Sequence, residues 1–402
     1  MKRAGPGLLV MAAFIGPGTV TTASKAGAEY GFALMWALLF SVLATLVLQE
    51  MAARLGLVTG RGLSQALRSS FESRFFTGMA VVLVVLAIGF GNAAYESGNI
   101  SGASMGLAAI TPWSTNIWAL VVGGIAFSLL ASGRYRVVER GLVILVVVMS
   151  AVFLATMLMV GPDLMAMAGG LTRPSLPAGS TLTVMALIGT TVVPYNLFLH
   201  SSAVREKWPE SVPVDEALRE SRRDSVLSIG LGGLITLSIV TTAAAAFFGT
   251  DIAFSAATIS QQLEPLLGPA AKYFFAIGLL AAGLTSAITS PLAAAYAVSG
   301  ALGWQADLSN RRFKIIWMLV LGSGMLAAAL GTRPISAIMF AQAANGFLLP
   351  VVAVYLLYVM NSRRLLGDFR NRWRSNIVGV TVVVVVSGLG IFKLLQVFGL
   401  VG

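Results

Sequence analysis

Two short stretches of the chain combine helix-breaking residues with side chains that could contact a solute. The first is Gly16-Pro17-Gly18-Thr19, inside the first long apolar segment, and the second is Val192-Val193-Pro194-Tyr195-Asn196, inside a later one. Proline removes a backbone donor and glycine lowers the cost of non-helical dihedrals, so each stretch predicts a broken helix. At bilayer depth, unwound backbone persists only where protein buries it or where it lines a cavity. The two breaks therefore predict a transport site for something polar.

A carboxylate, Glu96, falls inside another apolar segment and is surrounded by polar neighbours such as Asn99. Charge inside a membrane is costly and usually functional, so Glu96 is a candidate proton carrier or substrate contact. The structural alternative is an acid that is protonated or paired with arginine. His200, about a turn and a half beyond the second break, could relay protons or be a hydrogen-bonded core histidine.

The composition places these stretches in a membrane. The 402 residues are 57% hydrophobic and 11% charged, with a mean hydropathy of +0.86, values that fit a protein with many membrane spans. The absence of cysteine and the single histidine exclude disulfides, thiolate ligands and any multi-histidine metal site. No HExxH or Walker motif supports a membrane enzyme, and no repeated filter loop supports a channel. We expect no cofactor.

Eleven apolar segments are long enough to span a bilayer, and the two breaks fall in the first and the sixth of them. The predicted spans are 7–27, 30–53, 77–107, 115–132, 138–160, 181–203, 225–248, 270–302, 313–331, 334–360 and 376–399. Breaks at matching positions are typical of transporters built from inverted repeats. We therefore predict one domain, 1–402, with a first repeat at 1–160, a second at 181–360 and an extra helix at 376–399.

The net charge of +11 follows from topology. If the amino terminus is cytoplasmic, all but five of the 27 lysines and arginines lie on the cytoplasmic side, as the positive-inside bias requires. The carboxyl terminus is then outside, the cell (inner) membrane is the expected location, and no nucleic-acid partner is needed. We also predict a short amphipathic helix from Asp215 to Arg223, and an ion pair of Glu50 with Arg54 at the cytoplasmic end.

Several motifs resemble the Nramp family of divalent-metal transporters. Gly16-Pro17-Gly18-Thr19 stands where that family has Asp-Pro-Gly-Asn, and Ala26-Gly27-Ala28-Glu29-Tyr30-Gly31 is similar to its continuation. Pro194-Tyr195-Asn196-Leu197-Phe198-Leu199-His200-Ser201 resembles its Met-Pro-His motif and the residues that follow, and Ala341-Gln342-Ala343-Ala344-Asn345-Gly346 resembles its tenth helix. The resemblance implies a LeuT-type fold, alternating access and proton-coupled metal import.

The family's ligands fall on Gly16, Thr19, the carbonyl of Thr190, Val193 and Gln342, by this resemblance. The family's Asp and Met are thus absent, and a metal ion stripped of water needs anionic charge nearby. The acidic pair of its third helix falls on Glu96 and Asn99. The remaining candidates come from position alone. Tyr195 and Asn196 follow the second break and should line the pocket, whereas Gln342 and Asn345 share a helix face that could bind solute or join helices.

These departures favour a small polar or anionic solute as the cargo. Lys25, near the outer end of the first span, could line the outer vestibule with positive charge or extend to the interface, and helix amino ends at the breaks also carry partial positive charge. The alternative is a divalent cation, manganese or magnesium, with Glu96 supplying the negative charge and protons as a possible coupling ion. Besides this cargo, the lipid bilayer is the partner that the sequence implies.

Overall fold

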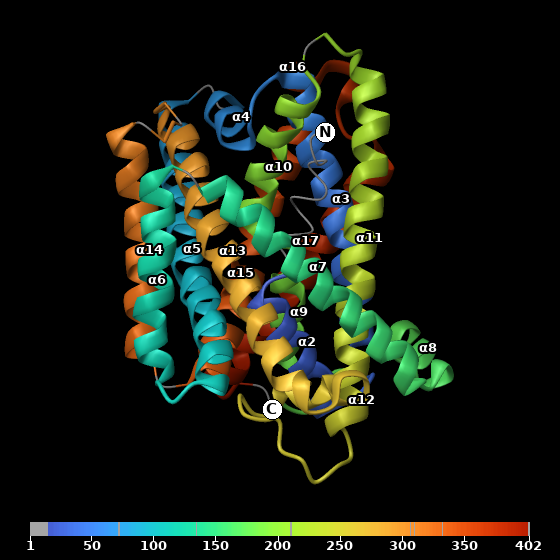
Figure 1. Ribbon diagram of the computed structural model, residues 1–402. Coiled ribbons are helices and arrows are strands. Elements are labelled where there is room, and N and C mark those ends of the chain that lie inside the picture. Colours follow the sequence, from blue (N-terminus) through green and yellow to red (C-terminus); the bar gives the residue numbers. More distant parts are fainter. Residues whose placement is uncertain are drawn as a thin grey trace.

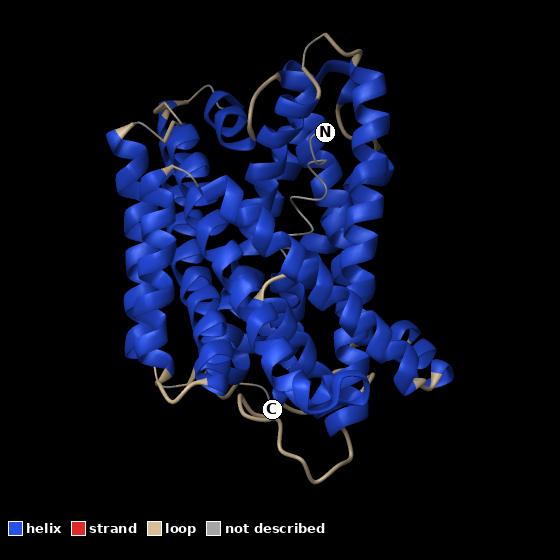
Figure 2. Cartoon of the chain, viewed as in Figure 1, coloured by secondary structure: helices blue, strands red, loops and turns tan. Residues whose placement is uncertain are grey.

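The computed structural model is a helical bundle, and it describes residues 15–70, 73–133, 135–209, 211–305, 307–308, 310–331 and 333–400. Figures 1 and 2 show helices that cross the bundle, with connecting loops mainly at its two ends. Ten helical segments in these ranges are long and apolar enough to cross a membrane. The all-helical membrane fold that the composition predicts is therefore confirmed.

The helices follow the order of the predicted spans, with short helices in the connections. Their bounds are α2 Pro17–Tyr30, α3 Met35–Thr59, α4 Leu63–Ser70, α5 Arg74–Ile110, α6 Thr115–Ser132, α7 Tyr135–Val160, α8 Leu164–Thr172, α9 Thr181–Thr191, α10 Pro194–Lys207, α11 Val214–Phe247, η1 Ile259–Leu263, α12 Glu264–Leu267, η2 Gly268–Ala270, α13 Ala271–Leu302, α14 Arg311–Leu330, α15 Pro334–Met360, α16 Arg363–Leu366, η3 Gly367–Phe369 and α17 Trp373–Val397.

The residues from Asp215 to Arg223 are helical, as predicted, but the prediction that they form a short helix of their own is wrong. These residues form the first turns of α11, which continues without interruption from Val214 to Phe247. Hydropathy locates the apolar part of this helix, but its polar turns extend beyond the apolar part. Trp208 Nε1 donates to Glu220 Oε2 at 2.7 Å, which holds this polar extension against the end of α10.

Both predicted breaks are helix boundaries. Gly16 is the extended N-cap of α2, and Pro17 is its first residue. The part of the predicted first span that precedes Ile15 lies outside the described residues. The sixth span consists of two half-helices, because α9 ends at Thr191 and α10 begins at Pro194. Proline at the first position of a helix needs no backbone donor, so both half-helices begin where the sequence allows it.

Small residues bring the central helices close together. A Cβ added at Gly27 of α2 would lie 2.1 Å from the Val240 carbonyl oxygen of α11. A Cβ added at Gly283 of α13 would lie 2.6 Å from Ala103 Cβ of α5. Such close backbone approach is the usual way in which membrane helices pack. The same packing sets α2, α5, α9, α13 and α15 around the two breaks.

The outer surface and the ends of the bundle differ in character. Large apolar side chains such as Phe90, Leu158 and Leu330 are more than 70% exposed, which suits contact with lipid tails. Figure 1 shows α4 and α16 at one end of the bundle and α8 and α12 at the other. We call the end with α4, α16 and the start of α11 the basic end, because most of the arginines and lysines predicted to be cytoplasmic belong to its connections.

Candidate functional site

The two helix breaks are joined by a direct side-chain contact. Thr19 Oγ1 of α2 and Thr190 Oγ1 of α9 are 2.9 Å apart, and both residues are fully buried. These threonines are 171 positions apart in the sequence. The fold therefore brings the beginning of α2 and the end of α9 into one site, and two of the residues predicted to bind substrate meet there.

Helix α15 closes one side of this site with the amide of Gln342. A Cβ added at Gly18 would lie 2.1 Å from Gln342 Nε2, so this side chain rests directly on the backbone of the first break. Neither amide atom of Gln342 has a hydrogen-bond partner among the described residues, and Asn345 Nδ2 also has none. Both side chains are buried, so water at the protein surface does not reach these atoms, and a solute bound at the breaks could bond to them.

Two tyrosines and a serine close the opposite side. The ring of Tyr195 meets that of Tyr95 edge to face, with centroids 5.5 Å apart. Within the described ranges, Tyr195 Oη and Asn196 Oδ1 are buried without a hydrogen-bond partner. A Cβ added at Gly16 would lie 2.9 Å from Ser286 Oγ of α13. The space that a side chain at position 16 would occupy is therefore filled by the Ser286 hydroxyl.

The second break supplies backbone oxygen as well. Pro194 occupies the position whose N–H would otherwise bond to the Thr190 carbonyl, so the sequence itself frees this oxygen. The carboxyl end of α9 carries partial negative charge, which favours a cation beside Thr190. Val193 is the N-cap of α10, and its carbonyl accepts from the Asn196 N–H at 3.0 Å. The apolar Val193 side chain offers no ligand.

Glu96 lies one layer outside the breaks. It follows Tyr95 by one residue, hence about 100° around α5, and it packs against Gly324 of α14. Asn99 Nδ2 donates to Glu96 Oε2 at 3.3 Å, while Glu96 Oε1 is buried without a hydrogen-bond partner in the described ranges. No ion pair to Glu96 is present among the residues that the structure describes. The arginine-paired alternative for Glu96 has no support among these residues, and the role of Glu96 stays a prediction.

A row of hydroxyl groups connects Glu96 with the first break. Ser286, which contacts Gly16, and Ser290, which lies beside the Glu96 carboxyl, are four residues apart and share one face of α13. Both hydroxyl oxygens are buried without a partner in the described structure. Sequence reasoning assigned no role to either serine, whereas it counted Tyr95 among the polar neighbours of Glu96. The spacing of four between serines in an apolar helix was the available signal.

His200 is buried on α10, and neither ring nitrogen has a hydrogen-bond partner within the described part of the chain. The described residues thus provide no hydrogen bond that would support the alternative of a hydrogen-bonded core histidine. Its role as a proton relay stays a prediction.

Lys25 does not act as a free cation in an outer vestibule. Its ammonium forms an ion pair with the Glu29 carboxylate one turn further along α2. The charge that favoured an anionic cargo is thus neutralised locally. Among the described residues, no group of three or more His, Cys, Asp or Glu side chains could hold a metal ion. The side chains placed at the breaks, Thr19, Thr190, Asn196 and Gln342, are neutral, so a cation there would face neutral oxygen atoms.

Comparison with known proteins gives one consistent family. The family described as "Natural resistance-associated macrophage protein-like" (Nramp) matches residues 7–396. The divalent metal cation transporter MntH of Acidiphilium cryptum is 29% identical over 98% of this chain and 90% of its own length. The protein of the same name from Deinococcus radiodurans is 28% identical, again over 98% of this chain and 90% of its own length.

Solved structures agree on the fold. The manganese transporter of Eremococcus coleocola, crystallised as a mutant, superimposes with a TM-score of 0.76 at 22% identity, covering 98% of this chain and 86% of that one. A nucleobase-cation-symport-1 family transporter in a closed conformation superimposes with a TM-score of 0.60 at 14% identity, covering 100% of this chain and 95% of that one. The LeuT-type fold with two broken helices is thus confirmed.

The predicted small polar or anionic cargo is wrong. Its basis was the missing Asp and Met ligands and the charge of Lys25, yet the relatives that match nearly the whole chain are named as divalent metal cation transporters. They favour the alternative, a divalent cation. The physical reason is that negative potential at a cation site can come from carbonyl oxygens and from a carboxylate one layer away, and a count of direct ligands omits both.

Proposed function

The chain belongs to the Nramp family, and from this premise we propose that it moves a divalent metal cation across the membrane by alternating access. One observation carries the proposal. Buried oxygen atoms without a hydrogen-bond partner among the described residues gather where the two helix breaks meet, on Tyr195, Asn196 and Gln342, beside the freed carbonyl of Thr190. Unpartnered buried polar atoms are costly in a folded protein, so a cluster of them indicates a bound polar species.

The donor set suits a hard cation that keeps part of its water. Amide, hydroxyl and carbonyl oxygens are ligands for magnesium and manganese, whereas soft thioether or thiolate ligands select other metals. Magnesium in particular dehydrates reluctantly and is usually bound with several waters in place. We propose that Thr19, Asn196, Gln342 and the Thr190 carbonyl contact the hydrated ion, with Gly16 and Val193 shaping the site and Tyr195 and Asn345 at its edges.

Glu96 supplies the negative charge in this proposal. Its free oxygen belongs to the row Ser286, Ser290, Glu96 and Asn99, which leads from the first break to α5 and α13. A buried carboxylate on such a row can compensate the cation charge or carry a proton in exchange for it. His200, which is also buried and has no hydrogen-bond partner in the part of the chain that the structure describes, is the second candidate for proton movement.

The repeat and the orientation complete the proposal. Residues 1–160 and 181–360 form the inverted repeats, each opening with a broken helix, and 376–399 is the extra helix. The protein lies in the cell (inner) membrane, and its basic end faces the cytoplasm. This orientation follows because the positive-inside bias applies to the short connections at the basic end. The carboxyl terminus is then on the outer side.

Uptake into proteoliposomes tests the function. Purified protein should accumulate Mn²⁺ or Mg²⁺ above the level of empty vesicles, and Glu96→Gln should reduce initial uptake by about tenfold or more, since one buried charge is removed next to the pathway. Glu264→Gln removes an exposed carboxylate on α12 and should leave uptake unchanged. Repeating the assay with an imposed pH gradient separates cation transport from proton coupling.

Absence of uptake for manganese, magnesium, iron and cobalt in protein that binds one of them by titration calorimetry would contradict transport. Equal uptake by the Glu96→Gln and Glu264→Gln variants would remove Glu96 from the mechanism while leaving the cation site intact.

A further inference from the structure

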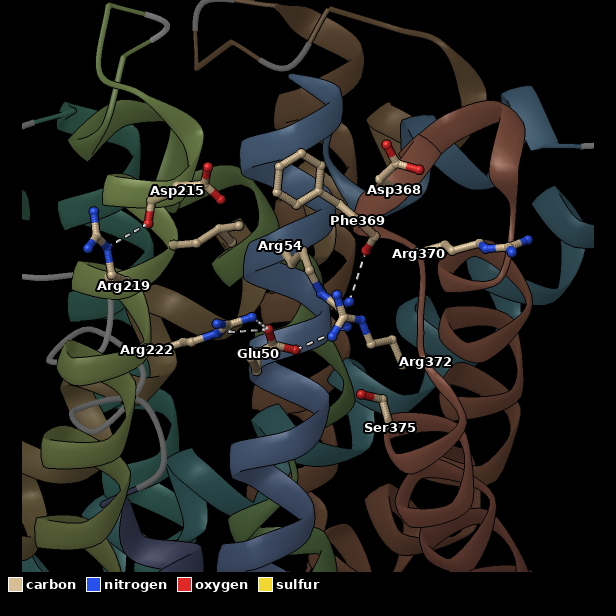
Figure 3. Close-up of a pocket in the computed structure, with 11 residues that line it drawn as sticks. Glu50, Arg54, Asp215, Arg219, Arg222, Asp368, Phe369, Arg370, Arg372 and Ser375 are labelled. Carbon is tan, nitrogen blue, oxygen red and sulfur yellow. Dashed lines mark hydrogen bonds and ion pairs between the residues drawn. The ribbon is translucent and has the colours of Figure 1, made fainter.

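A second polar cavity lies at the basic end, away from the helix breaks. It has a volume of about 570 Å³ and opens between α3, the start of α11, and the segment that joins α16 to α17 (Figure 3). Five arginines and three carboxylates line it, which leaves two positive charges in excess. The charged residues are Glu50, Arg54, Asp215, Arg219, Arg222, Asp368, Arg370 and Arg372. None of them takes part in the proposed cation site.

Part of this charge is used within the protein. Glu50 accepts from Arg222 at 2.7 Å and pairs with Arg54 at 3.2 Å, as Figure 3 shows. The predicted pair of Glu50 with Arg54 is thus confirmed. Arg54 also donates to the Phe369 carbonyl at 2.9 Å and to Asn371 Oδ1 at 2.7 Å, which fixes the segment before α17 on α3. Arg54 therefore has a structural role.

The remaining arginines are available to a ligand. Arg370 and Arg372 are exposed, and neither forms an ion pair within the described ranges. Arg219 donates to the backbone carbonyl of Asp215 at 3.3 Å, and no ion pair of its guanidinium is present within the described ranges. Guanidinium groups are well suited to phosphate because they offer several donors in a planar arrangement. The cavity is therefore matched to a phosphate-bearing anion.

An apolar groove continues from this cavity along the side of the bundle. It shares Glu50, Arg222 and Ser375 with the cavity, has a volume of about 400 Å³, and is otherwise lined mainly by apolar side chains of three helices. These side chains are Leu46, Val47 and Met51 of α3, Val226 of α11 and Val378 of α17. Trp373, beside the groove residue Arg374, is 67% exposed, as is typical of aromatic residues at a membrane interface.

We infer that the cavity and the groove together bind an anionic phospholipid. The phosphate and the headgroup occupy the cavity beside Arg219, Arg370 and Arg372, and one acyl chain lies in the groove between α3, α11 and α17. A soluble anion would use the charge and leave the groove empty, whereas a zwitterionic lipid would fill the groove without matching the excess positive charge. Basic pockets between membrane helices recognise anionic headgroups in this way. The inference requires no assumption about the transported ion.

Lipid binding to purified, delipidated full-length protein tests the inference. Native mass spectrometry in detergent should show dioleoylphosphatidylglycerol bound with higher affinity than dioleoylphosphatidylcholine. Arg370→Gln/Arg372→Gln should weaken binding of the anionic lipid by about thirtyfold, given the usual contribution of each basic residue near a membrane surface. Lysine at both positions should restore most of it.

Matched variants control for charge and for folding. Arg311→Gln/Lys314→Gln removes the same charge from exposed positions of α14 at the basic end, and should change the affinity by less than about twofold. Val226→Trp fills the groove and should weaken binding, whereas Val384→Trp, on a lipid-facing position of α17 outside the groove, should not.

Three results would overturn the inference. These are equal affinity for the two lipids, equal loss in the α14 control variant, and binding of glycerol 1-phosphate or inorganic phosphate as tight as that of the phospholipid. The last result would make the cavity a site for soluble anions. Failure of metal uptake would not affect any of these measurements.

Discussion

Replacing Gly16 by aspartate puts a carboxylate at the position that corresponds to the Asp of the Asp-Pro-Gly-Asn motif. The structure predicts that this side chain will not fit unless a neighbouring side chain is also changed. The backbone at Gly16 is extended, with φ −112° and ψ −176°, which any residue can adopt. The obstacle is the Ser286 hydroxyl oxygen, 2.9 Å from the position of the new Cβ. Removing that oxygen leaves Ser286 Cβ and Tyr95 Oη as the nearest atoms, both at 3.9 Å. Gly16→Asp/Ser286→Ala should therefore fit.

The expected gain in affinity follows from electrostatics. A carboxylate about 4 Å from a divalent ion contributes about 8 kcal/mol of attraction at an effective dielectric constant of about 20. Burying that carboxylate offsets several kcal/mol of this attraction. About 1.5 to 3 kcal/mol should remain, which corresponds to manganese binding that is roughly tenfold to a hundredfold tighter than in the unmodified protein.

Titration calorimetry with Mn²⁺ in detergent measures the change. The matched control is Gly16→Asn/Ser286→Ala, which has the same shape without the charge and should bind about as the unmodified protein does. Gly16→Asp alone should fold less stably and gain little affinity. If the single variant binds as tightly as the double variant, Ser286 does not limit the site. If the charged double variant gains nothing over its asparagine control, the cation does not bind at the first break.

Two further substitutions test the packing around the site. Gly27→Ala places a methyl group 2.1 Å from a carbonyl oxygen of α11 and should destabilise the protein by about 1 to 3 kcal/mol, seen as a lower melting temperature in detergent. Gly230→Ala is its control, since no atom lies within 4 Å of the added carbon. Thr190→Val keeps the shape but removes the bond to Thr19 and should cost about 1 kcal/mol; an unchanged melting temperature and unchanged uptake would show that the contact between the breaks is dispensable.

Much of the fold could be predicted from the sequence because its determinants are local. Pro17 and Pro194 each begin a helix, as the loss of a backbone donor requires. The apolar segments that follow are long enough to identify the spans without any knowledge of packing. Where the prediction erred, at the start of α11, polar residues continued a helix past its apolar part, and hydropathy does not report such turns.

The site was harder to predict because its contacts link residues that are distant in the sequence. The pairing of Thr19 with Thr190 depends on how α2 meets α9, and no local pattern encodes it. The position of Ser286 beside Gly16 depends in the same way on the packing of α13. A serine in an apolar helix looks like a packing residue until its neighbour is known. Thr190 became a candidate only through a family resemblance, and for Gln342 the helix face that it shares with Asn345 left open whether it binds solute or joins helices.

The cargo prediction failed because it considered direct ligands alone. At an effective dielectric constant of about 20, a carboxylate about 8 Å from a divalent ion still contributes about 4 kcal/mol, roughly half of what a contact at 4 Å provides. A charge at that distance, as Glu96 would supply from the second layer, leaves the water shell of the ion in place, so no dehydration has to be compensated.

This arrangement should suit magnesium better than the arrangement in which a carboxylate binds the ion directly, because magnesium releases its water reluctantly. The Gly16→Asp/Ser286→Ala variant should therefore shift the preference of the site toward manganese relative to magnesium. Competition between the two ions in the same calorimetric titration measures this shift. An unchanged ratio, together with tighter manganese binding, would show that the unmodified site already dehydrates its ion.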